Sequence, residues 1–532
     1  MSDRPHNLGI GVFGLSTGLM SLLDSIGVHY EECDTQKFDV PSNSVYIVHR
    51  ALSSKEQNWL HSQQEKAHTL AVLFTLESGV HPKSTSVQKK YCASVHSPHL
   101  MAGPLAHLSV IDCNSNVSFY GGKQDLDGIC YVERQKIESI EQSIYLGIPL
   151  EASVSKFSYT RKIFPSPTGH KPNEIVSRTH KGHLQHLLRY ALEQLFYSID
   201  LPFLSKWNFP TSQPIITLRI DSDFGTEKSL HAIYELANTY SAILTTFLHV
   251  KAHEDWLEWF TQWPKHEHSL HGYEHAHIRS SYPLYQDVEN GYQAMVQAGM
   301  TPKGYAAPYG IWSEQLSKAL DAYPFSYSSE FTHGYDSLPY WIPDSLASKP
   351  ALSSKRLQIP MHPICTGSLH RYRAVEKDFH AYFKHYMDIQ YGMQQPIMLY
   401  HHPLQPGLSS IKFIMEYAQE LDLQWLSYHE WATFWLQRAS ERNEVYYDKK
   451  KKRLISKDTP NMLYELKQDN RDFAIIHPND WDPQNMLPTH TLSFQTKKSG
   501  TMADKEYLQN RFSNKWQVWK ESFIQHRNRI RL

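Results

Sequence analysis

The first 150 residues alternate short apolar runs with amphipathic stretches. Leu8–Phe13 and Thr69–Thr75 are predicted to be buried strands, and Thr17–Ile26 places apolar residues every three to four positions, which predicts a helix. Short strands that alternate with helices are typical of a doubly wound α/β domain. Further apolar runs near 108–112 and 129–132 are expected to continue the same sheet.

A glycine pattern in the first strand suggests a dinucleotide-binding fold as an alternative for this segment. Gly9, Gly11 and Gly14 form GxGxxG, with Glu31 and Glu32 near the distance of a ribose-binding acid. In a dinucleotide-binding fold the first glycine follows the strand, whereas these glycines lie inside it. We therefore interpret them as part of an ordinary strand. The layout also resembles the flavodoxin-like domains related to class I glutamine amidotransferases, but no cysteine lies in a GxCxG turn, so no amidotransferase activity is implied.

A second β/α series begins at Ile215, after a turn-rich break and the amphipathic helix His180–Ile199. It ends with a strand–helix pair at 423–438, a length that suits one α/β barrel. The remaining sequence is polar, with a hairpin at 445–455 and a terminal helix near 505–526. We expect four parts: an N-terminal doubly wound α/β domain (1–164), a linker with a helix (165–214), a barrel (215–438) and a small β-rich domain (439–532).

Composition excludes several classes of function. Lys plus Arg number 53 and Asp plus Glu 54, so no net field favours nucleic acid, and the lysine run at 448–453 reads as a solvated turn. No segment approaches the roughly 18 consecutive apolar residues of a membrane span, and the N-terminus lacks a secretory pattern. The five cysteines are scattered, which fits a reducing compartment. We expect a cytoplasmic protein; its oligomeric state is not predicted.

Polar residues follow four of the predicted barrel strands. Side chains at the carboxyl ends of barrel strands converge on one mouth, so these segments are expected to meet. His271 and His275 can capture a metal together if their segment turns helically, and an aspartate would add a carboxylate. Two histidines and one carboxylate suit zinc and leave positions open for water and substrate. The four segments are Asp221-Ser-Asp223-Phe-Gly225, His271-Gly-Tyr-Glu-His275, Gly304–Gly310 and His401-His402-Pro403.

Each signal taken singly has a plain alternative. Thirty-two histidines make a His-x3-His spacing commonplace, and Asp223 precedes a predicted helix that it could cap. The segment GYAAPYG could form only a turn. The conjunction of these segments, in this order and each at a strand end, is far more specific.

In order and type, the four segments resemble the motifs of the polysaccharide deacetylase superfamily (carbohydrate esterase family 4), over about 215–437. LRIDSDFG resembles the first motif, HEHSLHGYEH the histidine motif, GYAAPYG the third and LYHHP the last. The resemblance implies a distorted (β/α) barrel that removes an acyl group from a sugar with a divalent metal, Zn²⁺ being the preferred ion. It implies Asp223, His271 and His275 as metal ligands.

The resemblance also implies the catalytic groups. Asp221 would be the base, His402 rather than His401 would protonate the leaving amine, and the backbone N–H near Tyr309 would stabilise the oxyanion. Phe331, Tyr335 and Trp341 are candidates for an aromatic rim that stacks on the sugar.

Two departures leave alternatives open. The arginine that braces the base in the family is Ala306 here, and the two aspartates are separated by Ser222, so their roles could be exchanged. A cytoplasmic amidohydrolase that acts on a ureide or formamide, and a degenerate barrel that only binds glycan, are the competing hypotheses.

Overall fold

The structure is a computed structural model. It describes the whole chain except residues 1–4, 34–42, 68–69, 81–84, 89–91, 96–109, 113–116, 121–128, 131, 135–141, 165, 276–282, 344–351, 459, 469–471, 482–486 and 489–532. The helix predicted near 505–526 lies outside the described residues. Among the described helices, none combines the length and apolar character needed to cross a bilayer.

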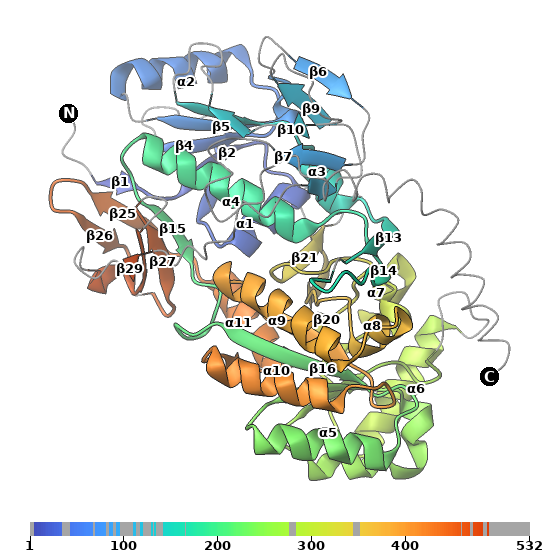
Figure 1. The fold of residues 1–532 in the computed structure, drawn as a ribbon. Helices are drawn as coiled ribbons and strands as arrows, with labels where there is room; N and C mark the ends of the chain where they lie inside the picture. The colour runs from blue at the N-terminus through green and yellow to red at the C-terminus, as the bar shows by residue number, and fades with distance from the viewer. Residues whose placement is uncertain are drawn as a thin grey trace.

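The N-terminal sheet has the strand order of a doubly wound domain. Its central strands are labelled in Figure 1. Its five parallel strands, numbered along the chain, lie in the order 2-1-3-4-5, which is the flavodoxin-like arrangement. A sixth strand pairs antiparallel at one edge. In spatial order the strands are β11 (Val132–Arg134), β12 (Ser143–Leu146), β5 (Ala71–Thr75), β4 (Val45–Val48), β2 (Ile10–Phe13) and β3 (Tyr30–Glu32).

Local sequence explains the first helix. The side chain of Ser16 accepts a hydrogen bond from the Leu19 N–H at the helix start, and Gly27 ends the helix with a left-handed φ of 86°. The structure therefore confirms the predicted bounds, Thr17–Ile26, for α1. The other helices of this part are α2 (Ser54–Ala67), α3 (Leu150–Ser155) and α4 (Lys181–Ser198), and a short 3-10 turn spans Leu76–Ser78.

Two sequence expectations for this region have different outcomes. Gly11 lies inside β2, where a side chain would collide with the ring of Tyr46, so close packing in a strand accounts for this glycine. The runs at 108–112 and 129–132 do not continue the first sheet as a whole. Their strands β8 (Val110–Asp112) and β10 (Ile129–Cys130) flank β7 (Cys92–Val95) in a separate sheet, and only β11 joins the large one. Two further pairs are β6 (Thr85–Gln88) with β9 (Val117–Tyr120), and β13 (Tyr159–Ile163) with β14 (Asn173–Ser177).

The second β/α series forms a curled, mostly parallel nine-stranded sheet, consistent with the predicted distorted barrel. The sheet is an open half-barrel, with the antiparallel strand β21 at one edge. In order, its strands are β21 (Tyr340–Pro343), β22 (Leu352–Gln358), β20 (Tyr327–Ser328), β19 (Gly304–Tyr305), β18 (Glu267–Leu270), β17 (Leu244–Leu248), β16 (Ile215–Asp221) and β23 (Ile397–His401), with β24 (Gln424–Trp425) also pairing with β16.

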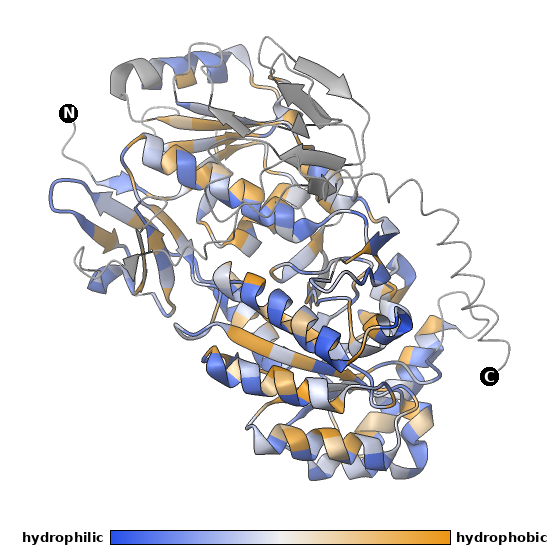
Figure 2. Cartoon of the chain, in the orientation of Figure 1, coloured by the Kyte–Doolittle hydropathy of each residue, from blue (hydrophilic) through white to orange (hydrophobic). Residues whose placement is uncertain are grey.

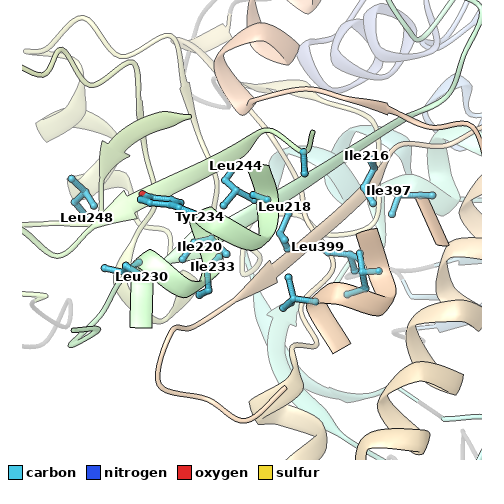
Figure 3. Packing of buried hydrophobic residues seen from close by; sticks show 14 of the residues in the cluster. Ile216, Leu218, Ile220, Leu230, Ile233, Tyr234, Leu244, Leu248, Ile397 and Leu399 are labelled. Atoms are coloured by element: carbon cyan, nitrogen blue, oxygen red, sulfur yellow. The ribbon is translucent and has the colours of Figure 1, made fainter. Parts of the chain in front are cut away.

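Helices cover the outside of this sheet (Figure 1). Aliphatic residues of β16, β17 and β23 pack against Leu230, Ile233 and Tyr234 of α5 (Figure 3). The tryptophan-rich segment that follows β17 is a run of 3-10 turns, η2 (Val250–Gln262), interrupted at Trp256 by a φ of −139°. The helical segments are α5 (Glu227–Thr239), η2, α6 (Leu284–Gln297), η3 (Pro308–Gly310), α7 (Glu314–Leu320), α8 (Thr366–Arg371), α9 (Glu376–Gly392), α10 (Leu408–Glu420) and α11 (Tyr428–Ser440).

Strands near the N-terminus and strands that follow the half-barrel share one hydrophobic core. Apolar residues of α4, the predicted linker helix, pack with the N-terminal sheet and with strands that follow the half-barrel, and Figure 2 shows the mixed apolar and polar character of α4. The division into domains stays a prediction. Helix α4, which was assigned to a linker, is part of the shared core. The strands that follow the half-barrel form two sheets with earlier ones: β1 (His6–Asn7) with β25 (Val445–Asp448) and β26 (Arg453–Ser456), and β15 (Phe203–Lys206) with β27 (Tyr464–Lys467), β28 (Asp472–Ile476) and β29 (Leu487–Pro488).

Arg438 connects α11 to this shared core. Its guanidinium is buried and donates to the carbonyl oxygens of Asp24, Ser25, Lys206 and Trp207 at 2.9–3.2 Å. Asp24 and Ser25 lie in the last turn of α1, where carbonyl groups lack helical partners and favour a cation.

Candidate active site

The carboxyl end of β16 places two aspartates at the mouth of the half-barrel. All seven residues of the strand are buried, and Asp221 is its last residue. The chain then turns at Asp223, which has a left-handed φ of 42°. Two hydrogen bonds fix this turn: His249 Nδ1 lies 3.0 Å from the Asp223 carbonyl oxygen, and the Ser222 hydroxyl accepts from the His249 N–H at 2.9 Å. The two carboxylates therefore come from one rigid strand end.

His271 and His275 follow β18, but the segment between them is not helical. Gly272 and His275 adopt left-handed φ values of 84° and 49°, and the carboxylate of Asp287 accepts from the Glu274 N–H at 2.7 Å. This bend brings the two rings to a centroid distance of 4.9 Å. The helical turn expected between His271 and His275 was wrong, and the bend at Gly272 brings the two rings together instead.

These histidines meet Asp223 in an arrangement that fits a divalent metal. Asp223 Oδ1 lies 3.5 Å from His271 Nε2 and 3.2 Å from His275 Nε2, and one ligand atom from each residue lies within 4.8 Å of the others. Burial would raise the pKa of Asp223, but His402, His271 and His275 lower it, so the carboxylate is ionised.

The hydrogen-bond pattern supports the same interpretation. His271 Nδ1 lies 2.7 Å from the Ala306 carbonyl oxygen, which can only accept, so Nδ1 donates this hydrogen bond and Nε2 is the ring nitrogen that faces Asp223. Asp223 Oδ1 is buried without a hydrogen-bond partner. A divalent cation between this oxygen and the two Nε2 atoms would give all three atoms a partner. The donor set therefore suits zinc or a related first-row ion.

Asp221 is held by an arginine that sequence reasoning did not identify. Arg219, fully buried on β16, donates from Nε to Asp221 Oδ1 at 2.5 Å and from Nη2 to Oδ2 at 2.8 Å. Its Nη1 donates to the Ser329 carbonyl oxygen at 3.0 Å, which fixes the guanidinium. Burial would raise the pKa of Asp221, but Arg219 and His271 lower it overall. Ala306 thus replaces the arginine of the family motif, while Arg219 braces the carboxylate from its own strand.

The two histidines at the end of β23 have different surroundings. His402 Nε2 lies 3.6 Å from Asp223 Oδ2 and 3.9 Å from Asp221 Oδ2. Burial would lower the pKa of His402, but Asp223, Cys365 and Asp221 raise it to about 10. His401 Nδ1 instead bonds Thr366 Oγ1 at 3.0 Å, and burial lowers the pKa of His401 to about 3.

The turn after β19 contributes Tyr309. This residue has a left-handed φ of 61°, and its ring centroid lies 5.1 Å from that of His275. Beneath the turn, the buried carboxyl group of Glu330 accepts from the Ala307 N–H at 3.3 Å. Burial raises the pKa of Glu330 to about 7. The proposed oxyanion contact at the Tyr309 backbone stays a prediction.

These residues line one cleft of about 740 Å³. Asp221, Asp223, His271, His275, Tyr309 and His402 all contribute to its surface. Of the three aromatic candidates for a sugar rim, Phe331 lines the cleft, whereas Tyr335 and Trp341 are buried in the neighbouring core. The catalytic and metal-binding roles of the six residues stay predictions.

Sequence reasoning missed three residues besides Arg219. His249 directly follows β17, so its place at a strand end was a usable signal. Ser222 also bonds His253 Nε2 at 2.8 Å, which ties the DSD turn to η2. Cys365 lines the cleft and donates to Gln405 Oε1 at 3.2 Å; burial would raise the pKa of its thiol, but His402 lowers it to about 7. No spacing pattern points to Cys365.

Comparisons with known proteins find similarity in three dimensions. No family model and no curated protein matches the sequence. A structure from Mycobacterium smegmatis described as a polysaccharide deacetylase is 14% identical and covers 44% of this chain and 94% of its own, with a TM-score of 0.36. Puue allantoinase is 17% identical over 44% of this chain and 93% of its own, with a TM-score of 0.37.

A carbohydrate esterase family 4 pseudoenzyme from Bacillus anthracis is also similar, with 12% identity over 42% of this chain and 66% of its own and a TM-score of 0.30. The similar structures thus include the superfamily whose motifs the sequence resembles. They also include a protein named as a pseudoenzyme.

Proposed function

We propose that this protein is a metal-dependent hydrolase that removes an N-acyl group from a sugar or glycan intermediate. The observation that carries the proposal is the meeting of Asp223, His271 and His275 beside an Asp221 held by Arg219, with His402 Nε2 3.6 Å from Asp223 Oδ2. A glycan-binding protein has no need for a base and an acid on either side of a metal set. Hydrolysis needs both.

Each group has a distinct task in this reaction. Asp223, His271 and His275 would hold a divalent cation, which supplies polarisation of the acyl oxygen and a lowered pKa for water. Asp221 accepts the proton of the attacking water, and Arg219 keeps this carboxylate ionised and oriented. His402 donates a proton to the leaving nitrogen. The backbone N–H of Tyr309 stabilises the charge that develops on the acyl oxygen.

The substrate follows from the location that the sequence suggests. In the cytoplasm a mature wall polymer is out of reach. A sugar nucleotide, a lipid-linked intermediate or a short oligosaccharide is therefore the better candidate, and acyl removal during the synthesis of a surface glycan would use such a substrate.

Metal content tests the first part of the proposal. Purified protein is expected to contain about one zinc-like ion per chain by elemental analysis, and His271→Ala should remove it. His231→Ala is the matched control because this imidazole lies on the exposed side of α5, with a side chain 54% exposed. Equal metal content in both variants would contradict the assignment.

Product release tests the second part. Acetate should be released from N-acetylglucosamine oligomers or sugar nucleotides by the metal-loaded protein, and Asp221→Asn should abolish the release. Turnover of ureides without turnover of acyl sugars would favour the amidohydrolase hypothesis. Saturable binding of sugar without any turnover would favour the glycan-binding barrel.

A further inference from the structure

One wall of the cleft comes from outside the half-barrel sheet. Arg161, Glu174 and Ile175 belong to the hairpin β13–β14, and His370 and Arg371 end α8. The hairpin precedes the first barrel strand by about 40 residues of chain. The hairpin lies outside the four motif segments, so the motifs do not predict which residues form this wall.

The wall carries more positive than negative charge. Arg161 Nη1 donates to Asn173 Oδ1, a neutral acceptor, at 2.6 Å. Arg371 Nη2 donates to Glu174 Oε2 at 3.3 Å and to Ser368 Oγ at 3.1 Å. Apart from Asp221 and Asp223, Glu174 is the one carboxylate among the described residues that line the cleft. Among the described residues of this wall, Arg371 therefore pairs with Glu174 while Arg161 bonds a neutral acceptor, so one positive charge is not balanced.

Both arginines remain accessible to a ligand. The side chain of Arg371 is 48% exposed, and that of Arg161 is partly exposed. Guanidinium groups bind phosphate and carboxylate oxygens through paired, charge-assisted hydrogen bonds. A cleft of about 740 Å³ has room for a sugar ring together with an acidic substituent.

We infer that the substrate is an acyl sugar with an oxyanion substituent, a phosphate or a carboxylate, which Arg161 and Arg371 bind while the acyl group lies at Asp223. This inference rests on the proposed hydrolase function and adds a specificity subsite to it. The neutral part of the sugar lies between the arginine wall and the metal-binding residues.

The test compares three N-acetyl sugars: N-acetylglucosamine, its 1-phosphate, and N-acetylmuramic acid, which carries a carboxylate. At least one anionic sugar is expected to have a kcat/KM about tenfold above that of the neutral sugar, as one charge-assisted hydrogen bond would give. The anionic sugar with the higher kcat/KM shows whether the arginines prefer a phosphate or a carboxylate. The preference should weaken in 0.5 M salt, because exposed charges are screened.

Variants assign the preference to the wall. Arg161→Gln and Arg371→Gln should each lower the ratio of anionic to neutral kcat/KM by about five- to tenfold. Lys412→Gln is the control because this lysine lies on α10 and pairs with Glu416, away from the cleft. An equal kcat/KM for all three sugars, or an unchanged ratio in both arginine variants, would overturn the inference.

A binding measurement separates this inference from the proposed reaction. Calorimetry of the 1-phosphate and the neutral sugar with Asp221→Asn protein, with and without Arg161→Gln, measures the subsite without turnover. If the 1-phosphate binds in an arginine-dependent way but the wild-type protein hydrolyses none of the sugars, the subsite is retained and the hydrolase is overturned. Hydrolysis without any preference for acidic sugars would retain the hydrolase and overturn the subsite.

Discussion

Arg219 and Asp221, two residues apart on one strand, form a bidentate ion pair at the mouth of the half-barrel. Residues i and i+2 of a strand point to the same face, so the pair needs no loop to bring it together. The guanidinium also bonds Ser329, which holds it from the opposite side. Asp221 is thus held by an arginine from LRIDSDFG, whereas the segment GYAAPYG has Ala306 and supplies no arginine.

Arg219→Leu is expected to lower kcat by about 100-fold and to change KM little, because a misdirected base affects the reaction more than substrate binding. Arg219→Lys should recover part of this loss since it keeps the charge. Arg356→Leu is the matched control: Arg356 is also buried, but it bonds Asp321 and Ser317 away from the cleft. Steady-state kinetics and thermal unfolding of all three variants are the measurements. A kcat loss in Arg356→Leu as large as that in Arg219→Leu would mean that destabilisation alone explains the effect.

Replacement of His402 and replacement of His401 should have different effects on the rate of hydrolysis. His402→Gln is expected to slow amide hydrolysis by about 10²–10³-fold, because a poor leaving group needs a proton donor. The loss should be much smaller on p-nitrophenyl acetate, whose leaving group departs without protonation. His401→Gln should leave the rate within a few-fold, since His401 bonds Thr366 instead of facing Asp223. Equal losses on both substrates would exclude His402 as the acid.

Glu330 should make the protein less stable as pH rises. Its pKa is raised by burial to about 7 in the folded chain and lies near 4.5 in the unfolded one. The folded state therefore binds more protons between pH 4.5 and 7, and the free energy of unfolding falls across that window. Glu330→Gln removes the titration, so it is expected to raise the free energy of unfolding by up to about 3 kcal/mol at pH 8 and by little at pH 4.5. Urea unfolding at both pH values measures this. A gain of the same size at both pH values would contradict the role of ionisation.

Replacement of Arg438 by Met is expected to destabilise the protein by about 3 kcal/mol or more. The methionine would fill part of the volume but leave the carbonyl groups of Asp24, Ser25, Lys206 and Trp207 without donors. Arg453→Met, at an exposed position, should change the free energy of unfolding by less than about 0.5 kcal/mol. Chemical denaturation followed by tryptophan fluorescence distinguishes the two. A small effect of Arg438→Met would mean that water satisfies those carbonyl groups.

Much of the half-barrel and its candidate site could be predicted because the sequence signals are local. Each candidate residue directly follows a short apolar run, and the carboxyl ends of parallel strands lie at one edge of a sheet. Asp223, His271, His275 and His402 could therefore be expected to lie together. The two-residue period of a strand places Arg219 on the same face as Asp221, so this pair was a usable signal that was overlooked. The contact of Arg219 with Ser329 could not be predicted, because it depends on how distant strands pair.

The remaining features depend on contacts between distant parts of the sequence. The hairpin β13–β14 lies in the cleft wall although it falls within the predicted N-terminal domain and linker. Helix α4 reads as amphipathic in sequence, but its apolar residues pack with strands that lie more than 200 residues later. The bend at Gly272 was misread because His-x3-His spacing also suits a helix.

The pairing of β1 with β25 and of β15 with β27 has a consequence for synthesis on the ribosome. Every strand of the half-barrel lies between 215 and 425, so this sheet can be completed while the chain is still attached. The core that starts at Leu8 is complete only after Trp481 has emerged. We therefore expect the first segment translated to be among the last to reach its final packing, and a truncation before β27 to leave it exposed to proteases.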